Sequence, residues 1–234
     1  MEAQRFPPVT HVIFDMDGLI LNTEELYSRA YDAALEKYGR KFTWELKKQQ
    51  MGRKNLEAIQ LMLDQFQLHG QVTAVEFKAE LQPHVDRLMP TARLLPGADK
   101  LIRHLHAHQV PIALCTGSAE EFYALKTQKH RQLFSLFNPV VLCGSDPAIE
   151  RGKPDPQCFQ VCASRFSPAP TKPISVLVLE DAVNGVEAAR AAGMQAVMVP
   201  DPRVTDEERR AATLCLQSLE ELDPAIFGLP AFPD

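Results

Sequence analysis

An uninterrupted apolar run at residues 12–14 leads into two carboxylates, Asp15 and Asp17, and then Gly18. Apolar residues without alternation are typical of a strand buried on both faces, the usual state of a parallel sheet. Side chains alternate along a strand, so Asp15 and Asp17 begin on the same side of the chain. Ligands of open α/β sheets bind beyond the carboxyl ends of the strands. The stretch therefore predicts a parallel sheet and, at its edge, two acids whose repulsion a cation or a shared proton must relieve.

Downstream of residue 96, segments with helical spacing alternate with short apolar runs. This alternation is typical of a parallel sheet whose strands are joined by right-handed helical crossovers. We therefore predict an α/β fold with a doubly wound parallel sheet. The expected helices span residues 98–108, 120–129, 156–166 and 184–192, and the expected strands span residues 111–115, 140–142, 175–179, 195–199 and 212–216.

Residues 23–90 differ from the rest of the chain, because their apolar residues keep helical spacing without a convincing strand. Thr73 and Glu76 match a capping box at the start of one helix, as Asn22 and Glu25 do at the start of another. The block interrupts the chain after the first strand, so it is an insertion. The expected domains are a discontinuous α/β core, residues 1–22 and 91–234, and a helical cap, residues 23–90.

The composition narrows the classes of partner. The 234 residues are 45% apolar and 24% charged, with a net charge of −5, as in an ordinary soluble globule. An acidic chain without a long Lys/Arg cluster is poorly suited to a nucleic acid polymer or a membrane surface. The N-terminus has no apolar signal-peptide core and the five cysteines form no C-x-x-C pair, so we expect free thiols and a cytoplasmic protein. The expected partner is a small molecule, and the protein is expected to be a monomer or a weak homo-oligomer.

Some polar residues are expected to have structural roles. His104 and His108 share one face of a predicted helix, but no acid or cysteine completes a ligand set, so we expect both at the surface. Asn184, with Glu187 three residues later, is the expected N-cap of the helix at 184–192.

Four short motifs follow predicted strands of the core. Each is weak by itself, but an acid pair, a hydroxyl in a loop of small residues, a lysine and a second acid pair, in that order, are far more specific. The motifs are Asp15-Met16-Asp17-Gly18, Thr116-Gly117-Ser118, Gly152-Lys153-Pro154-Asp155-Pro156, and Glu180-Asp181 with Asn184-Gly185 close behind.

The acid pairs suit a hard divalent cation. Mg²⁺ prefers oxygen ligands and usually keeps some water. The expected ligands are the carboxylates of Asp15 and Asp181 and the main-chain carbonyl of Asp17, with Glu180 reaching the ion through water. A bound phosphate would add negative charge, which the cation and Lys153 would offset.

The loop at Thr116, Gly117 and Ser118 is the expected phosphate site. Thr116 supplies a hydroxyl, and backbone N–H groups at a helix start bind anions. Ser118 and Glu121 match a capping box that would place a helix start there. Arg53, in a break between two cap helices, is a candidate for substrate contact, although a solvated turn is the more common role for a cationic loop.

These groups are sufficient for phosphoryl transfer. Asp15 can attack phosphorus as a covalent nucleophile, as aspartyl-phosphate enzymes do. Asp17 would protonate the departing alkoxide and later take a proton from the hydrolytic water. The acid role requires a raised pKa at Asp17, which neighbouring carboxylates under a closed cap would favour.

The four motifs together resemble those of the haloacid dehalogenase superfamily, specifically its phosphatases with a helical cap inserted after the first strand. The resemblance covers nearly the whole chain. Residues 10–18, 152–156, 180–186 and 227–230 look like the pseudouridine-5'-phosphatase branch. The resemblance implies a Rossmann-like core and a Mg²⁺-dependent phosphomonoesterase. Its implied substrate is a small phosphorylated metabolite, in particular a nucleoside 5'-monophosphate such as pseudouridine 5'-phosphate.

The family also implies roles for matching positions. These are Asp15 as nucleophile, Asp17 as acid/base, Thr116 and Lys153 on phosphate, and Asp181, with Glu180 of the same motif, on magnesium. Two positions depart from the family pattern: Asn22 stands where aspartate is usual, and Gly117 where serine is common. Asparagine caps a helix as well as aspartate does, and glycine still offers an N–H. Neither departure removes a catalytic group, so both concern substrate choice and rate.

Other functions fit parts of the pattern. A phosphosugar mutase uses the same core but shields the phospho-aspartate from water, and a sugar or glycerol phosphatase is a further alternative. A dehalogenase lacks an acid at the second position, so Asp17 counts against it. A non-catalytic receiver-like switch also combines acids, a hydroxyl and a lysine, but such a domain has about 120 residues without an inserted bundle. A catalytically inactive relative is expected to have lost Asp15, Asp17 or Lys153, and all three are present.

Overall fold

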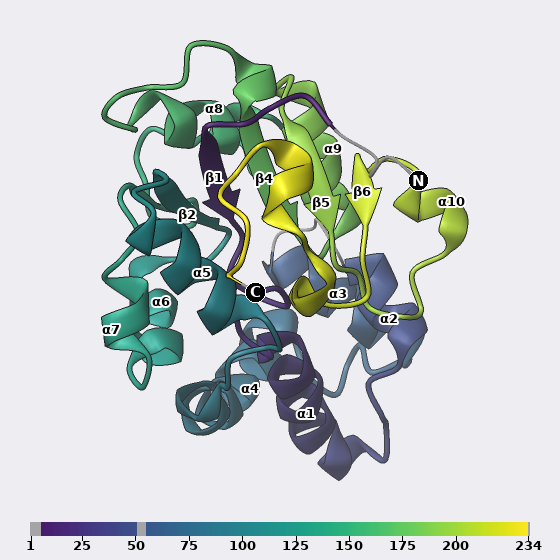
Figure 1. The fold of residues 1–234 in the computed structure, drawn as a ribbon. Coiled ribbons are helices and arrows are strands. Elements are labelled where there is room, and N and C mark those ends of the chain that lie inside the picture. The colour runs from purple at the N-terminus through teal and green to yellow at the C-terminus, as the bar shows by residue number, and fades with distance from the viewer. Residues whose placement is uncertain (1–5, 51–54, 234) are drawn as a thin grey trace. The chain divides into compact units, whose positions relative to one another are not determined.

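A six-stranded sheet organises the larger part of the chain within residues 6–50 and 55–233, which the computed structural model describes (Figure 1). Its order is β3-β2-β1-β4-β5-β6 and every neighbouring pair is parallel. The chain starts at the centre and winds to both edges, so the predicted doubly wound parallel α/β fold is confirmed. The strands are β1 (His11–Phe14), β2 (Ile112–Thr116), β3 (Val140–Leu142), β4 (Val176–Glu180), β5 (Gln195–Met198) and β6 (Leu214–Cys215).

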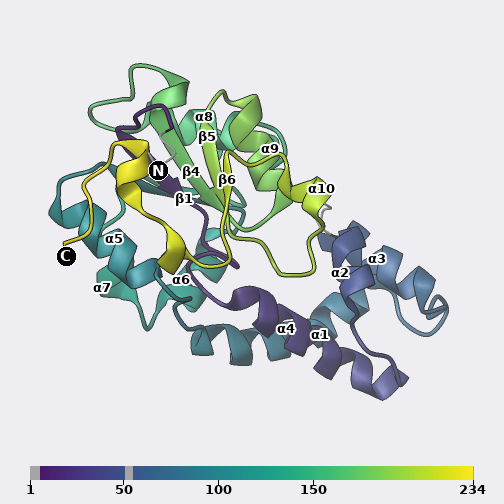
Figure 2. The same ribbon diagram turned by 45° about the vertical axis from the view of Figure 1, so that its right-hand side comes forward.

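Helices cover both faces of this sheet. Helices α8 and α9 pack against one face, whereas α5 packs against β2 on the other, the side on which the C-terminal turns lie (Figure 2). The short helices α7 and α10 were not predicted, because four residues are too few to show a period. The helices of this part are α5 (Ala98–Ala107), α6 (Glu120–Thr127), α7 (Arg131–Phe134), α8 (Gln157–Ser164), α9 (Val183–Ala191) and α10 (Asp206–Arg209).

The central strands form the core. Strands β1, β2, β4 and β5 are buried along their whole lengths. Layers of helices on both faces leave no strand face for polar residues, which explains the unbroken apolar runs in the sequence. Phe14 of β1, for example, is fully buried and packs edge-on against Phe137, with ring centroids 5.5 Å apart.

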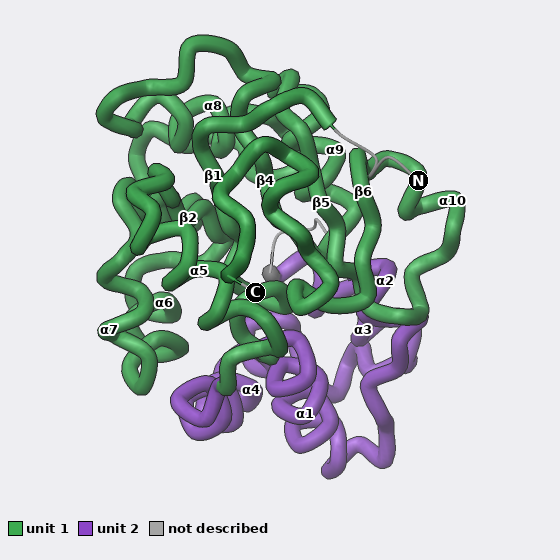
Figure 3. The backbone as a smooth tube through the Cα atoms, in the orientation of Figure 1, with its two compact units in different colours: residues 1–22, 93–234 green, residues 23–92 purple. Residues whose placement is uncertain are grey.

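The chain divides into two compact units, residues 1–22 with 93–234 and residues 23–92, coloured separately in Figure 3. The chain leaves the first unit after Asn22 and returns at Arg93. These residues pair with each other: Asn22 N donates to Arg93 O at 3.1 Å, and Arg93 N donates to Asn22 Oδ1 at 2.8 Å. The paired linkers bring the two ends of the insertion together.

The described residues of the second unit form helices without a strand. Helix α1 packs along α4, which also contacts α3. Thr73 and Glu76 form the predicted capping box at the start of α4. The helices are α1 (Thr23–Leu35), α2 (Trp44–Gln50), α3 (Asn55–Gln65) and α4 (Ala74–Leu88). In the part of the chain that the structure describes, no helix has both the length and the apolar character needed to cross a bilayer.

His104 is not at the surface, so that prediction was wrong. Its side chain is buried, and Nε2 donates to the carbonyl of Pro230 at 2.9 Å. The ring also packs on Phe232, with centroids 4.5 Å apart. The helix face that seemed open in the sequence is covered by the C-terminal segment, more than 100 residues away in the chain. His108 is exposed, as predicted.

Candidate active site

The ends of three adjacent strands lie level at one edge of the sheet. Phe14 of β1 pairs with Leu114 of β2 and with Leu179 of β4. Asp15 continues the ladder, because its N–H donates to Leu179 O at 3.0 Å. The first, second and fourth sequence motifs therefore begin side by side, as the position of each after a parallel strand predicts.

Lys153 joins the third motif to this edge. Its ammonium lies 2.6 Å from Asp15 Oδ1 and 2.5 Å from Glu180 Oε1, and it also donates to the carbonyl of Cys115 at 3.2 Å. The side chains of Lys153, Asp15 and Glu180 are only 11%, 8% and 1% exposed. One cation thus lies between two buried carboxylates, at the ends of the neighbouring strands β1 and β4.

The loop that carries Lys153 is held by its neighbour Gln157. The side-chain oxygen of Gln157 accepts from Glu150 N and Arg151 N at 3.0 and 2.9 Å. In turn, Gln157 N donates to Asp155 Oδ1 at 3.0 Å. These contacts fix the backbone on both sides of Lys153, which explains how a long flexible side chain from a loop has a defined place.

Burial dominates the electrostatics of Asp15. It raises the pKa of this carboxyl to about 7, against the lowering effect of Lys153, and the charges of Glu180 and Asp17 add to the rise. Burial alone would lower the pKa of Lys153, but Asp15 and Glu180 hold it well above its usual range. Lys153 is therefore positively charged. The carboxylates around it carry more negative charge than this one lysine can neutralise.

Asp17 belongs to a second polar group beside the first. Its carboxylate accepts from Lys126 Nζ at 2.7 Å, from Ser118 Oγ at 2.9 Å and from Thr116 Oγ1 at 3.3 Å. Lys126 Nζ also donates to Ser118 Oγ at 2.9 Å. The predicted capping box of Ser118 and Glu121 was wrong, since Ala119 is the N-cap of α6 and makes no side-chain cap. The hydroxyl of Ser118 binds Asp17 instead of a helix end.

Lys126 was not identified in the sequence. Its side chain is only 2% exposed, although it lies on a helix whose other charged residues face solvent. The one signal in the sequence is its position four residues after Phe122 and three after Tyr123, on the same side of the helix. A lysine on a helix face that packs inward must find a negative partner, and here the partner is Asp17.

The phosphate loop that the sequence predicts runs from the buried end of β2 to exposed residues. Thr116 is fully buried, and its Oγ1 accepts from Ser118 N at 3.2 Å, while Gly117 is exposed. The loop rests on Gly144: a Cβ there would lie 2.7 Å from Ala119 N. Glycine at this position therefore lets the loop after β3 approach the loop of Thr116, Gly117 and Ser118 closely. The remaining predicted contact, Arg53, lies outside the described residues.

Asp15, Glu180 and Asp181 form a group of oxygen donors, each offering a carboxylate oxygen within 4.8 Å of the others. Such a set fits a hard cation like Mg²⁺ in chemistry and spacing. Glu180 also pairs with Lys153. The carboxylate of Asp17 lies in the Lys126 group, and a contribution from Asp17 through its main-chain carbonyl stays a prediction.

Glu180 is fitted tightly against helix α9. A Cβ on Gly185 would lie 2.0 to 2.3 Å from the carboxylate atoms of Glu180, so only glycine leaves room for them. Helix α9 begins at Val183 with Ala182 as N-cap. The predicted N-cap, Asn184, was therefore wrong, because this residue already lies inside the first turn.

Comparison with known proteins identifies the family. A "Probable pseudouridine-5'-phosphatase" of Drosophila melanogaster is 46% identical over 226 residues, covering 97% of this chain and 96% of that protein. A "(DL)-glycerol-3-phosphatase 2" of Arabidopsis thaliana is 44% identical over 226 residues, covering 97% and 94%. In fold, the chain is similar to a HAD family hydrolase of Deinococcus radiodurans R1, with a TM-score of 0.76 and 24% identity over 94% of this chain and 96% of that one. The sequence profile of haloacid dehalogenase-like hydrolases matches residues 9–193, and the chain belongs to that family.

Proposed function

We propose that this protein is a Mg²⁺-dependent phosphomonoesterase that hydrolyses a small phosphorylated metabolite through an aspartyl-phosphate intermediate. The observation that carries the proposal is the convergence of Asp15, Lys153 and Glu180, three buried charged groups from distant segments, at the carboxyl edge of the sheet. Asp17 and Asp181 lie at the same edge. Family membership and the phosphatase names of both relatives support the reaction class.

Asp15 is the proposed nucleophile. Its carboxylate oxygen attacks phosphorus, and the bond between phosphorus and the leaving oxygen breaks. Lys153 provides the cation that phosphate oxygens need, with Glu180 and Asp15 fixing its ammonium. Asp15 and Asp181, with the main-chain carbonyl of Asp17, would hold Mg²⁺, which when bound supplies positive charge against the phosphoryl group. Thr116 and the N–H groups of Gly117 and Ser118 are the proposed contacts to the remaining phosphate oxygens.

Asp17 is the proposed acid and base. In the first step it gives a proton to the departing alkoxide, and in the second it takes one from the water that breaks the bond between Asp15 and phosphorus. An ammonium 2.7 Å away favours the ionised form of a carboxyl group, so Lys126 prepares Asp17 for the second step. In the first step Asp17 must be protonated. The charge of Lys126 acts against this protonated form, whereas the neighbouring carboxylates were expected to favour it.

Lys126 is expected to act as a positioning residue. Replacing it with methionine (Lys126→Met) should lower kcat about 10- to 100-fold with little change in KM, because Asp17 loses its charged partner and keeps only the hydroxyl contacts with Ser118 and Thr116. The matched control is Lys129→Met, which removes an exposed lysine just after the same helix. Steady-state kinetics with a common phosphomonoester measures both. Equal losses in the two variants, or a change confined to KM, would contradict the role.

Gly185→Ala tests whether the position of Glu180 matters. The added methyl group would displace the Glu180 carboxylate and weaken its contact with Lys153, so we expect turnover to fall about 10- to 100-fold. Gly152→Ala is the control, because a Cβ there meets nothing within 4 Å, although the residue lies next to Lys153. If both variants kept wild-type turnover, the exact place of Glu180 would be irrelevant to the reaction.

The substrate is the finer part of the proposal. We favour a nucleoside 5'-monophosphate such as pseudouridine 5'-phosphate, the substrate in the name of the Drosophila relative. Glycerol 3-phosphate is the second candidate, because the Arabidopsis relative named for it is almost as similar. We also propose that the helical unit of residues 23–92 is the cap that selects the leaving group. Arg53 is its proposed substrate contact.

A phosphate-release screen with Mg²⁺ tests this function. The panel contains pseudouridine 5'-phosphate, ordinary nucleotides, glycerol 3-phosphate and sugar phosphates, each with Mg²⁺ and with a chelator. We expect Mg²⁺-dependent release, with the highest kcat/KM for pseudouridine 5'-phosphate. A long-lived phosphoenzyme with an isomerised sugar phosphate as product would identify a mutase instead. No release from any member would overturn the proposal.

A further inference from the structure

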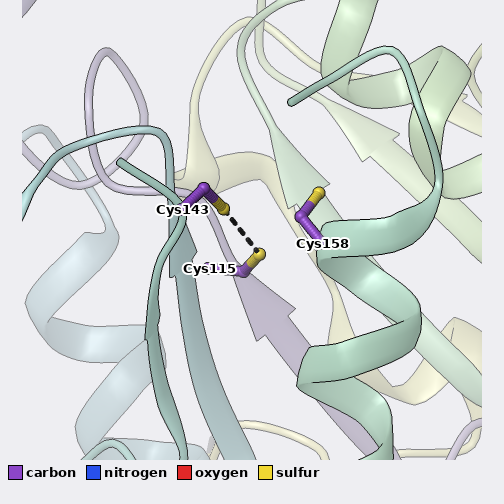
Figure 4. Close-up of side chains that lie close together, drawn as sticks. All are labelled: Cys115, Cys143 and Cys158. Carbon is purple, nitrogen blue, oxygen red and sulfur yellow. Dashed lines mark hydrogen bonds between the residues drawn. The ribbon is translucent and has the colours of Figure 1, made fainter. Parts of the chain in front are cut away.

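Three cysteines lie close together (Figure 4), and one of them, Cys115, accepts a hydrogen bond from Lys153 of the proposed active site through its main-chain carbonyl. Cys115 is on β2, Cys143 follows β3, and Cys158 is in the first turn of α8. Their sulfur atoms all lie within 4.8 Å of one another, and the Sγ atoms of Cys115 and Cys143 are 3.9 Å apart. All three are free cysteines. The proposed phosphatase reaction uses none of them.

The spacing of the sulfur atoms fits a metal ion. Zinc binds thiolate sulfur at about 2.3 Å in tetrahedral sites, so two sulfurs on one ion are about 3.8 Å apart. The Cys115–Cys143 pair, at 3.9 Å, is already close to this separation. The third sulfur, within 4.8 Å of both, needs to move by less than about 1 Å. A set made only of sulfur donors selects soft, thiophilic cations over Mg²⁺, whereas the nearby carboxylates have the opposite preference.

The surroundings provide an entrance and a compensating charge. Cys115 and Cys158 are fully buried, while Cys143 is half-buried and gives access from solvent. The hydrogen bond with Cys115 and burial raise the pKa of Cys143. Against the lowering effect of its hydrogen bond with Cys115, the contact with Cys143 and burial raise the pKa of Cys158 to about 12. Lys153, which donates to the carbonyl of Cys115, acts in the opposite direction, because its charge lowers both pKa values. A metal cation bound by the three sulfurs would displace the thiol protons. The Lys153 ammonium lies close enough to balance part of the negative charge of the resulting thiolates.

We propose that Cys115, Cys143 and Cys158 form a binding site for one thiophilic divalent cation of the Zn²⁺ class, separate from the carboxylate site. Binding breaks three S–H bonds, forms three metal–sulfur bonds and releases three protons to solvent, which leaves a complex of charge −1. A water molecule would complete the coordination on the side of Cys143. The site does not depend on the proposed phosphatase function.

Occupation of this site is expected to affect Lys153. The complex adds negative charge next to an ammonium that Asp15 and Glu180 hold from the other side. The main chain provides a second link, because Cys143 N donates to the carbonyl of Thr116, in the proposed phosphate loop, at 2.9 Å. The thiophilic cation should therefore act as an inhibitor that binds outside the substrate site.

Titration of the reduced protein with Cd²⁺ tests the site itself. Excess Mg²⁺ is present to occupy the carboxylates, and the readout is the ultraviolet thiolate-to-metal charge-transfer band. We expect one Cd²⁺ per chain in the wild type and an affinity at least about 100-fold lower in Cys143→Ser and Cys143→Ala. The control is Cys215→Ser. Cys215 is half-buried on β6, at the opposite edge of the sheet, so this variant should bind Cd²⁺ like the wild type.

Circular dichroism verifies that each variant is folded before titration. An absent band in the wild type would overturn the proposal, as would a band of equal strength and affinity in both Cys143 variants. These binding results do not require any phosphatase activity, so failure of the proposed function would not be mistaken for failure of the site.

Inhibition tests the coupling to Lys153. With saturating Mg²⁺, one equivalent of Cd²⁺ should reduce phosphate release on the order of tenfold in the wild type and in Cys215→Ser, and a chelator should restore it. Cys143→Ser should resist this concentration. Equal inhibition of Cys143→Ser would assign the effect to the carboxylates and overturn the coupling.

Discussion

Asp15→Asn is expected to reduce turnover of any substrate at least about 10³-fold, the scale seen when a covalent nucleophile is removed. The amide keeps the shape of the carboxyl group but cannot attack phosphorus. Lys153 keeps its pair with Glu180 in this variant, and burial raises the pKa of Asp15 to about 7, so a neutral group of the same shape should not lower the melting temperature. Phosphate release and thermal unfolding measure the two effects.

The control for this prediction is Asp99→Asn, which neutralises an exposed carboxylate on α5 that pairs with Arg103. It should keep wild-type turnover. If Asp15→Asn retained even a tenth of wild-type activity after deamidation had been excluded by mass spectrometry, the covalent mechanism would be wrong.

Lys153→Met is the second large effect that we expect. Turnover should fall about 10²- to 10³-fold, because the phosphate loses its cationic partner. Removing one member of a buried ion pair leaves the other uncompensated, so the free energy of unfolding should also fall, by about 3 kcal/mol. Lys153→Arg should not restore full activity, since a planar guanidinium cannot replace a point charge between Asp15 and Glu180. Kinetics and urea unfolding provide the measurements.

A double variant separates the two roles of Lys153. Adding Glu180→Gln to Lys153→Met removes a buried charge that lost its partner, so much of the lost stability should return. Activity should not return, because the cation is still absent. Recovery of turnover in the double variant would show that Lys153 serves only to support the fold.

The fold and the first group of site residues could be predicted because each depends on local sequence. An apolar run buried on both faces marks a strand, and the residue after it lies at a known edge, as with Asp15 and Glu180. Lys153 could be predicted from the order of the motifs. Its contacts with both carboxylates could not, because they depend on how Gln157 holds the loop.

Residues whose partners lie far away in the chain were missed or misassigned. Ser118 matches a capping pattern, yet its hydroxyl binds Asp17, more than 100 positions earlier in the chain. Lys126 has an ordinary place on a helix, and only the packing of α6 shows that it is buried beside the same carboxylate. The cysteine group likewise depends on strands and a helix meeting in three dimensions, which no local pattern reveals.

Trapping the covalent intermediate is the most direct test of the central claim, that Asp15 attacks phosphorus. Enzyme is mixed with Mg²⁺ and its best substrate, quenched within one turnover, reduced with borohydride and digested, and the peptides are analysed by mass spectrometry. We predict reduction of the Asp15 side chain to an alcohol, dependent on substrate and absent in Asp15→Asn. A modification at another carboxylate, or none while phosphate is released, would contradict the account.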